Sequence, residues 1–133
     1  MMREGSGNCL TNKYKNRKVI TAEGEFDSVR EYHRYLDLRL LERAGKITDL
    51  QRQVKFVLIP AQYETCERYS KKTDKRLKDG RRCLEKECSY LADFVYQADG
   101  QKVVEDAKGC RTEAYKIKKK LMLYIHGIRI REV

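Results

Sequence analysis

The sequence has no apolar stretch near the roughly 18 residues that a membrane-spanning helix needs, no glycine-rich phosphate loop and no internal repeat. Its first residues, "MMREGSGNCL", lack the apolar centre of a signal peptide. Its five cysteines are odd in number and irregular in spacing, which argues against the disulfide framework of a secreted protein. We therefore expect a cytoplasmic protein with reduced thiols, no nucleotide-binding loop and no membrane partner.

Positive charge is what the sequence has in excess. Lys and Arg number 30 against 20 Asp and Glu, which gives a net charge of +10 and a pI near 9.4. This balance indicates a polyanionic partner such as nucleic acid. The length of 133 residues suits one domain. We place that domain at residues 18–133, after a polar, basic arm at residues 1–17 that we expect to be flexible.

The N-terminal half of this domain predicts a small hairpin and then a helix. The hairpin is expected at "KVITAEGEF", around a Glu-Gly turn. The helix is expected at "DSVREYHRYLDLRLLERAG", with Gly45 as its C-terminal cap. In this segment Val29, Tyr32, Leu36 and Leu40 follow the spacing of one apolar helix face.

The remaining segments predict strands on both sides of a second helix. Strands are expected at "QVKFVLIP", "CSYLADFVY" and "QKVVEDAKG", and an Asp-Gly turn makes the last two a hairpin. A helix at "TEAYKIKKKLMLYIHG" and an alternating strand at "IRIREV" follow. Between the first two strands lies an insertion at about residues 64–88, dense in Lys and Arg, which we expect to be mobile or helical. The fold class is therefore α/β, with a mixed central sheet flanked by helices.

Charged residues at the end of the third strand are candidates for chemistry. Side chains alternate along a strand, so Asp106 and Lys108 point the same way, about 6.6 Å apart at Cα, and Glu105 points the other way. The expected hairpin also brings Asp93 near Asp106. Two carboxylates in a low-dielectric site repel each other unless a cation lies between them, and oxygen ligands suit Mg²⁺ or Mn²⁺. An ordinary salt-bridge network on a solvated sheet face is an equally good explanation of these charges.

Glu31 is a fourth candidate, because it lies at the border of the predicted apolar helix face. A structural role explains it as well. In "SVRE", Ser28 at the N-cap and Glu31 three residues later form a capping box. The spacing alone does not decide between capping and catalysis.

The combined pattern resembles the PD-(D/E)XK nuclease superfamily, whose restriction-endonuclease-like core runs αβββαβ. More closely, the segments "FDSVREYHRYLDLRLLERAGKITDLQRQVKFVLIP", "YLADFVY", "VVEDAKG" and "YKIKKKL" resemble an uncharacterised phage and prophage family catalogued as domain of unknown function 1064. The resemblance covers most of residues 18–133 and leaves out the basic insertion.

This resemblance implies a set of site residues. Asp93, Asp106 and Glu31 would be the metal ligands and the acidic catalytic residues, Lys108 the catalytic lysine, and Gln53 a residue that lines the site. Glu105 stays an alternative to Asp106, because a bulge or a slip in register would exchange the two.

The implied activity is Mg²⁺- or Mn²⁺-dependent hydrolysis of phosphodiester bonds in DNA, in phage recombination or DNA processing, with branched or Holliday-junction DNA as a substrate. The protein would act in the host cytoplasm, and a homodimer would suit cleavage of two strands. The alternative is a nucleic-acid-binding accessory protein without catalysis, whose acids are structural.

Two further sets of residues are candidates for binding. The first comprises cations that could contact DNA phosphates: Lys116, Lys118, Lys119 and Lys120 on the second helix, and Arg81 and Arg82 in the insertion. The second comprises Cys66, Cys83 and Cys88, which could bind zinc although they lack a CxxC pair.

Overall fold

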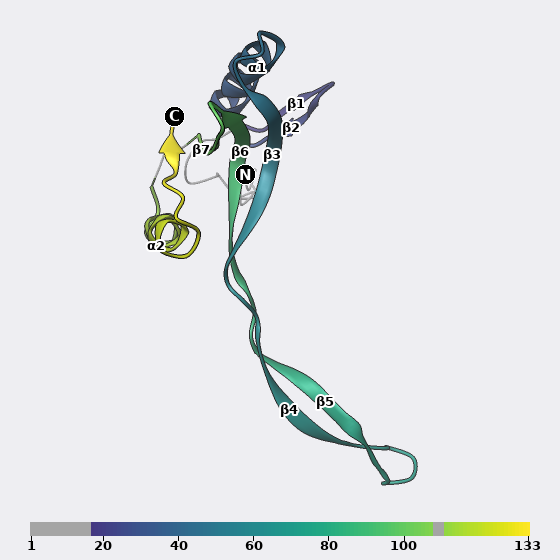
Figure 1. Cartoon of the computed structure of the whole chain (residues 1–133). Coiled ribbons are helices and arrows are strands. Elements are labelled where there is room, and N and C mark those ends of the chain that lie inside the picture. Colours follow the sequence, from purple (N-terminus) through teal and green to yellow (C-terminus); the bar gives the residue numbers. More distant parts are fainter. Residues whose placement is uncertain (1–16, 108–110) are drawn as a thin grey trace, which may run out of the picture.

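The computed structural model describes residues 17–107 and 111–133 (Figure 1). Its elements run in the order β1 (Val19–Thr21), β2 (Gly24–Phe26), α1 (Val29–Arg43), β3 (Thr48–Ile59), β4 (Gln62–Tyr69), β5 (Arg76–Glu85), β6 (Cys88–Ala98), β7 (Gln101–Asp106), α2 (Glu113–Leu121), the π-helical turn η1 (Met122–His126) and β8 (Arg131–Glu132). The chain is thus a mixed α/β protein, as the sequence predicts. The two helices, the hairpin β1–β2 and the strands β6 and β7 begin close to where the patterns place them. Strand β3 begins five residues earlier than expected, β8 is much shorter than expected, and β4 and β5 lie where no strand was predicted.

One four-stranded mixed sheet forms the centre of the fold. Its order is β3-β6-β7-β8, with β3–β6 and β6–β7 antiparallel and β7–β8 parallel. One apolar cluster, on the α1 side, consists of Leu38, Ile47, Phe94 and Tyr96. The other, on the α2 side, consists of Leu58, Tyr90, Ala92, Val95, Val104, Tyr115, Met122 and Ile130. Each helix therefore packs on the sheet through its own apolar cluster, α1 through Leu38 and α2 through Tyr115.

Helix α1 begins as predicted but turns a different face inward. Ser28 is its N-cap, and Gly45, with φ of 74°, follows its C-terminus in the left-handed conformation that glycine adopts without strain. The predicted apolar face was wrong, because Val29 and Leu40 are 47% and 63% exposed. The two fully buried residues of the helix are Glu31 and Leu38.

The reason for this rotation is aromatic packing next to the helix. Tyr35, one turn beyond Glu31, packs on Phe26 of β2 and stacks on Phe94 of β6, with ring centroids 5.2 and 6.4 Å apart. These contacts fix the face of α1 that carries Glu31, Tyr35 and Leu38 toward the sheet. The Glu31 carboxylate is thus fully buried, although the periodicity of apolar residues predicts it only at the border of the apolar face.

The insertion forms a long β-hairpin arm, defined here as β4, β5 and their connecting turn. In Figure 1 this arm extends from the end of β3 and β6, away from both helices. β4 and β5 pair in antiparallel fashion, with Tyr63 opposite Cys83 and Arg68 opposite Leu77. The insertion is therefore a β-hairpin and not the helix that was one of its two expected forms. β3 and β6 are already antiparallel neighbours, so strands that continue from them pair with no change of direction.

No helix within residues 17–107 and 111–133 is long and apolar enough to cross a membrane.

Candidate functional site

Strand β7 places two buried acids on opposite sides of the sheet. Glu105 is opposite Phe94 in the β6–β7 ladder, and both lie on the α1 side. Arg34 of α1 donates to both Glu105 oxygens, at 2.9 and 2.7 Å, and the Tyr96 hydroxyl donates to Glu105 Oε1 at 2.5 Å. Arg131 adds a second, longer ion pair at 3.8 Å. Glu105 is thus held by two ion pairs and the hydrogen bond from Tyr96, which is a structural arrangement.

Asp106 faces the other side and is 1% exposed. The Tyr90 hydroxyl donates to Asp106 Oδ2 at 2.5 Å, and burial together with Asp106 raises the pKa of that tyrosine. Tyr90 is therefore a neutral donor that orients the carboxylate. Between the two acids that the sequence left as alternatives, the geometry places Asp106 on the side of Asp93.

Asp93 lies where β6 changes sides. Tyr90 and Ala92 belong to the α2-side cluster, but Phe94 belongs to the α1-side cluster, so regular alternation is interrupted at this residue. On β3 the facing residue, Gln53, has a φ of 52°, which is the left-handed region. This irregularity leaves the Asp93 carboxylate half-buried and directed at the end of β7, where the Ala107 N–H donates to Asp93 Oδ2 at 2.9 Å.

The electrostatics of Asp93 show how close the acids are. The pKa of Asp93 is raised to about 7, first by burial and then by the charge of Asp106. The charge of Glu31 and a side-chain hydrogen bond with Asp106 also raise this pKa, whereas the hydrogen bond from the Ala107 N–H lowers it. A carboxyl group with such a pKa is protonated in a large part of the molecules at neutral pH. Asp93 and Asp106 are thus a mutually repelling pair of the kind expected from the sequence.

Glu31 is connected to this pair through an amide. Gln53 Nε2 donates to Glu31 Oε1 at 3.0 Å and lies 3.4 Å from Asp93 Oδ1. Glu31 is 2% exposed, and burial, with Asp27 nearby, raises the pKa of its carboxyl group. Gln53 therefore lies between two acids, one from α1 and one from β6.

The capping role of Glu31 is also present. The Glu31 N–H donates to Ser28 Oγ at 3.1 Å, and Glu31 Oε2 accepts from the Asp27 N–H at 3.1 Å. The side chain thus folds back over the helix start with one oxygen and meets Gln53 with the other. Capping and membership of the acidic cluster are compatible in this geometry.

The acids fit a divalent cation in part. Asp93 and Asp106 offer carboxylate oxygens of the type that Mg²⁺ and Mn²⁺ prefer, and a cation between them would relieve the repulsion that raises the pKa of Asp93. Glu31 reaches the pair through the Gln53 amide. Within the described residues no group of three or more His, Cys, Asp or Glu side chains is arranged to hold a metal ion. Lys108, the predicted catalytic lysine, lies outside the described residues.

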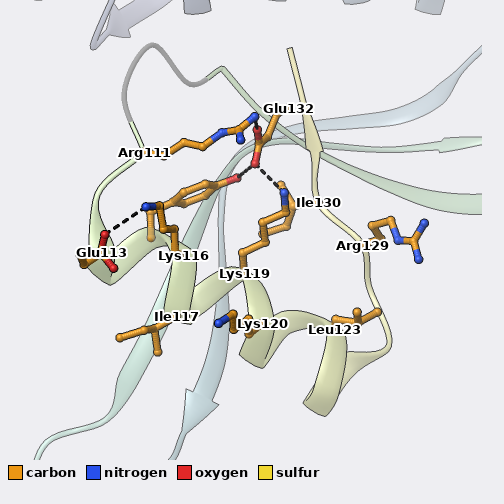
Figure 2. Close-up of a pocket in the computed structure, with 11 residues that line it drawn as sticks. Arg111, Glu113, Lys116, Ile117, Lys119, Lys120, Leu123, Arg129, Ile130 and Glu132 are labelled. Carbon is orange, nitrogen blue, oxygen red and sulfur yellow. Dashed lines mark hydrogen bonds and ion pairs between the residues drawn. The ribbon is translucent and has the colours of Figure 1, made fainter.

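A basic groove lies between α2 and the segment that leads into β8. Figure 2 shows this groove, a cavity of about 590 Å³ lined by Arg111, Glu113, Tyr115, Lys116, Ile117, Lys119, Lys120, Leu123, Arg129, Ile130 and Glu132. Its lining holds five cations against two carboxylates. An anionic ligand would therefore be attracted to it.

Contacts at Glu132 join this groove to the acidic site. Lys119 Nζ and the Tyr115 hydroxyl donate to Glu132 Oε1 at 2.6 and 3.0 Å, and Arg111 pairs with the other oxygen (Figure 2). Glu132 is the register partner of Asp106 in the β7–β8 pair. The groove thus ends beside the strand that carries the buried acids.

The predicted DNA-contacting cations differ in their surroundings. Lys119 is bound to Glu132, and exposed Lys116 pairs with Glu113 at 3.0 Å. Lys120 lines the groove, whereas half-buried Lys118 is not among its lining residues. On the arm, Arg82 pairs with Glu64, and the Arg81 guanidinium lies 4.2 Å from the centre of the Tyr63 ring.

The three cysteines do not meet. Cys66 lies opposite Gly80 in the β4–β5 ladder, and Cys83 lies opposite Tyr63. Three residues along a strand separate the two positions by about 10 Å. Cys88 begins β6, beyond the end of the arm. All three carry free thiols. The arrangement gives no support to a zinc site.

Sequence reasoning missed the three residues that bind the acids of β7, namely Tyr90, Tyr96 and Arg34. The only signal for Arg34 was its place one turn after Glu31 on the same helix. Tyr90 precedes Asp93 by three residues, which regular alternation puts on the opposite face, so no sequence pattern links it to Asp106.

Comparison with known proteins gives one match. A family model with the description "Protein of unknown function (DUF1064)" matches residues 11–131. No curated protein and no solved structure matches the chain significantly.

Proposed function

The chain belongs to this family of unknown function, and we propose that it is a metal-dependent endonuclease that hydrolyses phosphodiester bonds in DNA. The observation that carries the proposal is the pair Asp93 and Asp106, whose mutual repulsion in a buried site helps to raise the pKa of Asp93 to about 7. Strongly perturbed carboxyl groups beside a basic groove are typical of catalytic sites. The net charge of +10 favours a polyanionic substrate such as DNA.

The order of elements supports the same proposal. Leaving out the arm and the small hairpin, the chain runs α1, β3, β6, β7, α2, β8, which is the αβββαβ order of restriction-endonuclease-like folds. Asp93 lies on the second strand of that series and Asp106 on the third, as the resemblance to PD-(D/E)XK nucleases implies.

In this proposal Asp93 and Asp106 hold Mg²⁺ or Mn²⁺, and Glu31 completes the acidic side. The bound cation would polarise a phosphoryl oxygen and lower the pKa of a water molecule. The Ala107 N–H and the Tyr90 hydroxyl fix the two aspartates, so the carboxylates are oriented before substrate binds. Lys108 would stabilise the charge of the transition state, by the resemblance alone.

The basic groove supplies the neighbouring DNA contacts. Lys120 and Arg129 line it, and no ion pair of either residue is recorded within the described ranges, so their charges are available to phosphates. Lys116 and Lys119 would exchange Glu113 and Glu132 for phosphate oxygens. Glu132 lines the groove and pairs with Asp106 between β7 and β8, so one end of the groove lies next to the acids. A DNA strand bound in the groove would therefore lead toward them.

The test is cleavage of labelled linear, forked and four-way-junction DNA in Mg²⁺ or Mn²⁺. We expect the wild type to cut at least one substrate, and Asp93→Asn and Lys108→Ala to lose cleavage while they still bind DNA. Asp99→Asn is the matched control, because Asp99 is exposed in the turn after β6 and has a φ of 51°, which Asn tolerates. Equal cleavage by wild type and Asp93→Asn would refute the proposal.

A non-catalytic DNA-binding role is the second candidate. One observation favours it: within the described residues, no three metal-ligating side chains are arranged as a ligand set. This candidate predicts salt-sensitive binding without cleavage of any substrate in either metal. The same assay separates the two candidates.

A further inference from the structure

The tip of the β4–β5 arm concentrates positive charge at the end of the molecule that is remote from β7 and its acids (Figure 1). Residues 70–78 contain five cations and one acid, Asp74. The chain turns here through hydrogen bonds from Ser70 N to Lys75 O and from Asp74 N to Ser70 O, both 2.9 Å. Every residue from 71 to 79 is exposed. The turn thus presents its side chains to solvent on all sides.

The lysines of the tip are separate from the ion pairs of the arm. Arg76 pairs with Glu67 and Asp79. No ion pair is recorded, in the part of the chain that the structure describes, for four exposed lysines of the tip: Lys71, Lys72, Lys75 and Lys78. Their charges therefore remain available to an outside anion.

The arm has no apolar core that would explain its length. Its large apolar side chains are exposed, with Tyr69 at 55% and Leu84 at 52%. Figure 1 shows the arm projecting beyond both helices. A two-stranded hairpin by itself is marginally stable in water. A projecting ribbon of this kind is suited to contact a binding partner outside the domain.

The shape of the ribbon suits double-stranded DNA. The ten residues of β5 span about 33 Å, which corresponds to about ten base pairs. A two-stranded ribbon fits the major groove. Within the arm, Gly80 leaves room for the Arg68 side chain of the paired strand, with which a Cβ would collide. The negative charge of DNA phosphates complements the cationic tip. A second copy of the arm carries the same positive charge and would repel it.

We propose that the tip of the β4–β5 arm, through Lys71, Lys72, Lys75 and Lys78, binds the phosphate backbone of double-stranded DNA. This contact does not involve the acidic site and needs no metal. It goes beyond the proposed function, because it would anchor a duplex to the protein whether or not the acids cut it.

The experiment measures binding of a labelled duplex of about 30 base pairs, three times the span of β5. Fluorescence anisotropy is recorded in EDTA, so that cleavage cannot contribute, over about 50 to 200 mM NaCl. The test variant is Lys71→Gln/Lys72→Gln. The control, Lys46→Gln/Lys102→Gln, removes the same charge from exposed residues at the opposite end of the sheet.

We expect the tip variant to bind about tenfold more weakly, and its slope of log affinity against log salt to fall by about two, one for each phosphate contact. The control should keep the wild-type slope. Equal slopes for the tip variant and the wild type would overturn the proposal, and so would equal losses in tip variant and control. Loss of self-association on size-exclusion chromatography, with unchanged DNA binding, would also overturn it and identify a second copy as the occupant. Because no metal is present, absence of cleavage elsewhere does not affect this result.

Discussion

Replacing Asp93 by Asn should stabilise the protein while it removes the proposed activity. Asn has nearly the same shape, and its side-chain oxygen can still accept from the Ala107 N–H, as Asp93 Oδ2 does at 2.9 Å. The substitution removes the charge that Asp106 and Glu31 repel. The folded state therefore loses an unfavourable interaction and keeps its hydrogen bond.

The magnitude follows from the pKa of Asp93. The interval between the ordinary value of 3.8 and about 7 in the folded protein corresponds to about 4 kcal/mol at neutral pH. The side chain is only half-buried, and solvent screening reduces the effect. We expect a gain of about 2 kcal/mol in the free energy of unfolding, or a rise in Tm of roughly 6 °C.

The sign of the pH dependence is fixed by the direction of the shift. Because the folded pKa is the higher one, the folded state binds the proton more tightly, and the penalty is absent below the ordinary pKa of 3.8. It grows as the pH rises from 3.8 and is complete above about 7. The stability gain of Asp93→Asn should therefore be near zero at the acidic end and largest at the neutral end.

The assay is urea denaturation at a series of pH values, without metal, for the wild type, Asp93→Asn and the control Asp99→Asn. Addition of Mg²⁺ should stabilise the wild type more than Asp93→Asn. A destabilised Asp93→Asn at neutral pH would refute the reasoning, because it would show that the Asp93 carboxylate is a net stabilising group. A gain that is the same at all pH values would refute its electrostatic origin.

Three further changes test the surroundings of the acids. Tyr90→Phe removes the donor to buried Asp106 and should cost about 1–3 kcal/mol in urea denaturation; an unchanged midpoint would mean that this hydrogen bond is not formed. Arg34→Met removes the closer of the two guanidinium groups beside fully buried Glu105, leaves Arg131 at 3.8 Å, and should cost about 3 kcal/mol, whereas the double variant with Glu105→Gln should recover part of this loss. Ser28→Ala should lower thermal stability by about 1 kcal/mol through loss of the N-cap, as monitored by circular dichroism, and wild-type stability would exclude the cap.

The sequence predicts the elements well because each carries a local signal. The N-cap serine, the glycine after the helix and the Asp-Gly turn determine where α1 and the β6–β7 hairpin begin or end. Strand alternation is equally local, and it correctly separates Glu105 from Asp106. The arm was not predicted as a hairpin, because its strands are mostly exposed and carry little apolar alternation.

The missing parts of the site depend on contacts between distant residues. The buried face of α1 follows from Tyr35 packing on Phe26 and Phe94, which no spacing within the helix reveals. The connection of Gln53 to Glu31 depends on the left-handed backbone at Gln53, a conformation that a glutamine seldom adopts. Such an outlier at the meeting point of three elements indicates a constraint from function or packing.

The distribution of charge argues for a role of the acids beyond structure. Glu105 has an arginine partner, so its burial is compensated. The Asp93 carboxyl group contacts an amide, a backbone N–H and the Asp106 side chain, none of them a cation, and the charges of Asp106 and Glu31 raise its pKa. A protein that only bound DNA would become more stable, and would repel phosphate less, if Asp93 were an asparagine. Retention of an acid that costs stability is expected where that acid serves a function, such as holding a cation against phosphate.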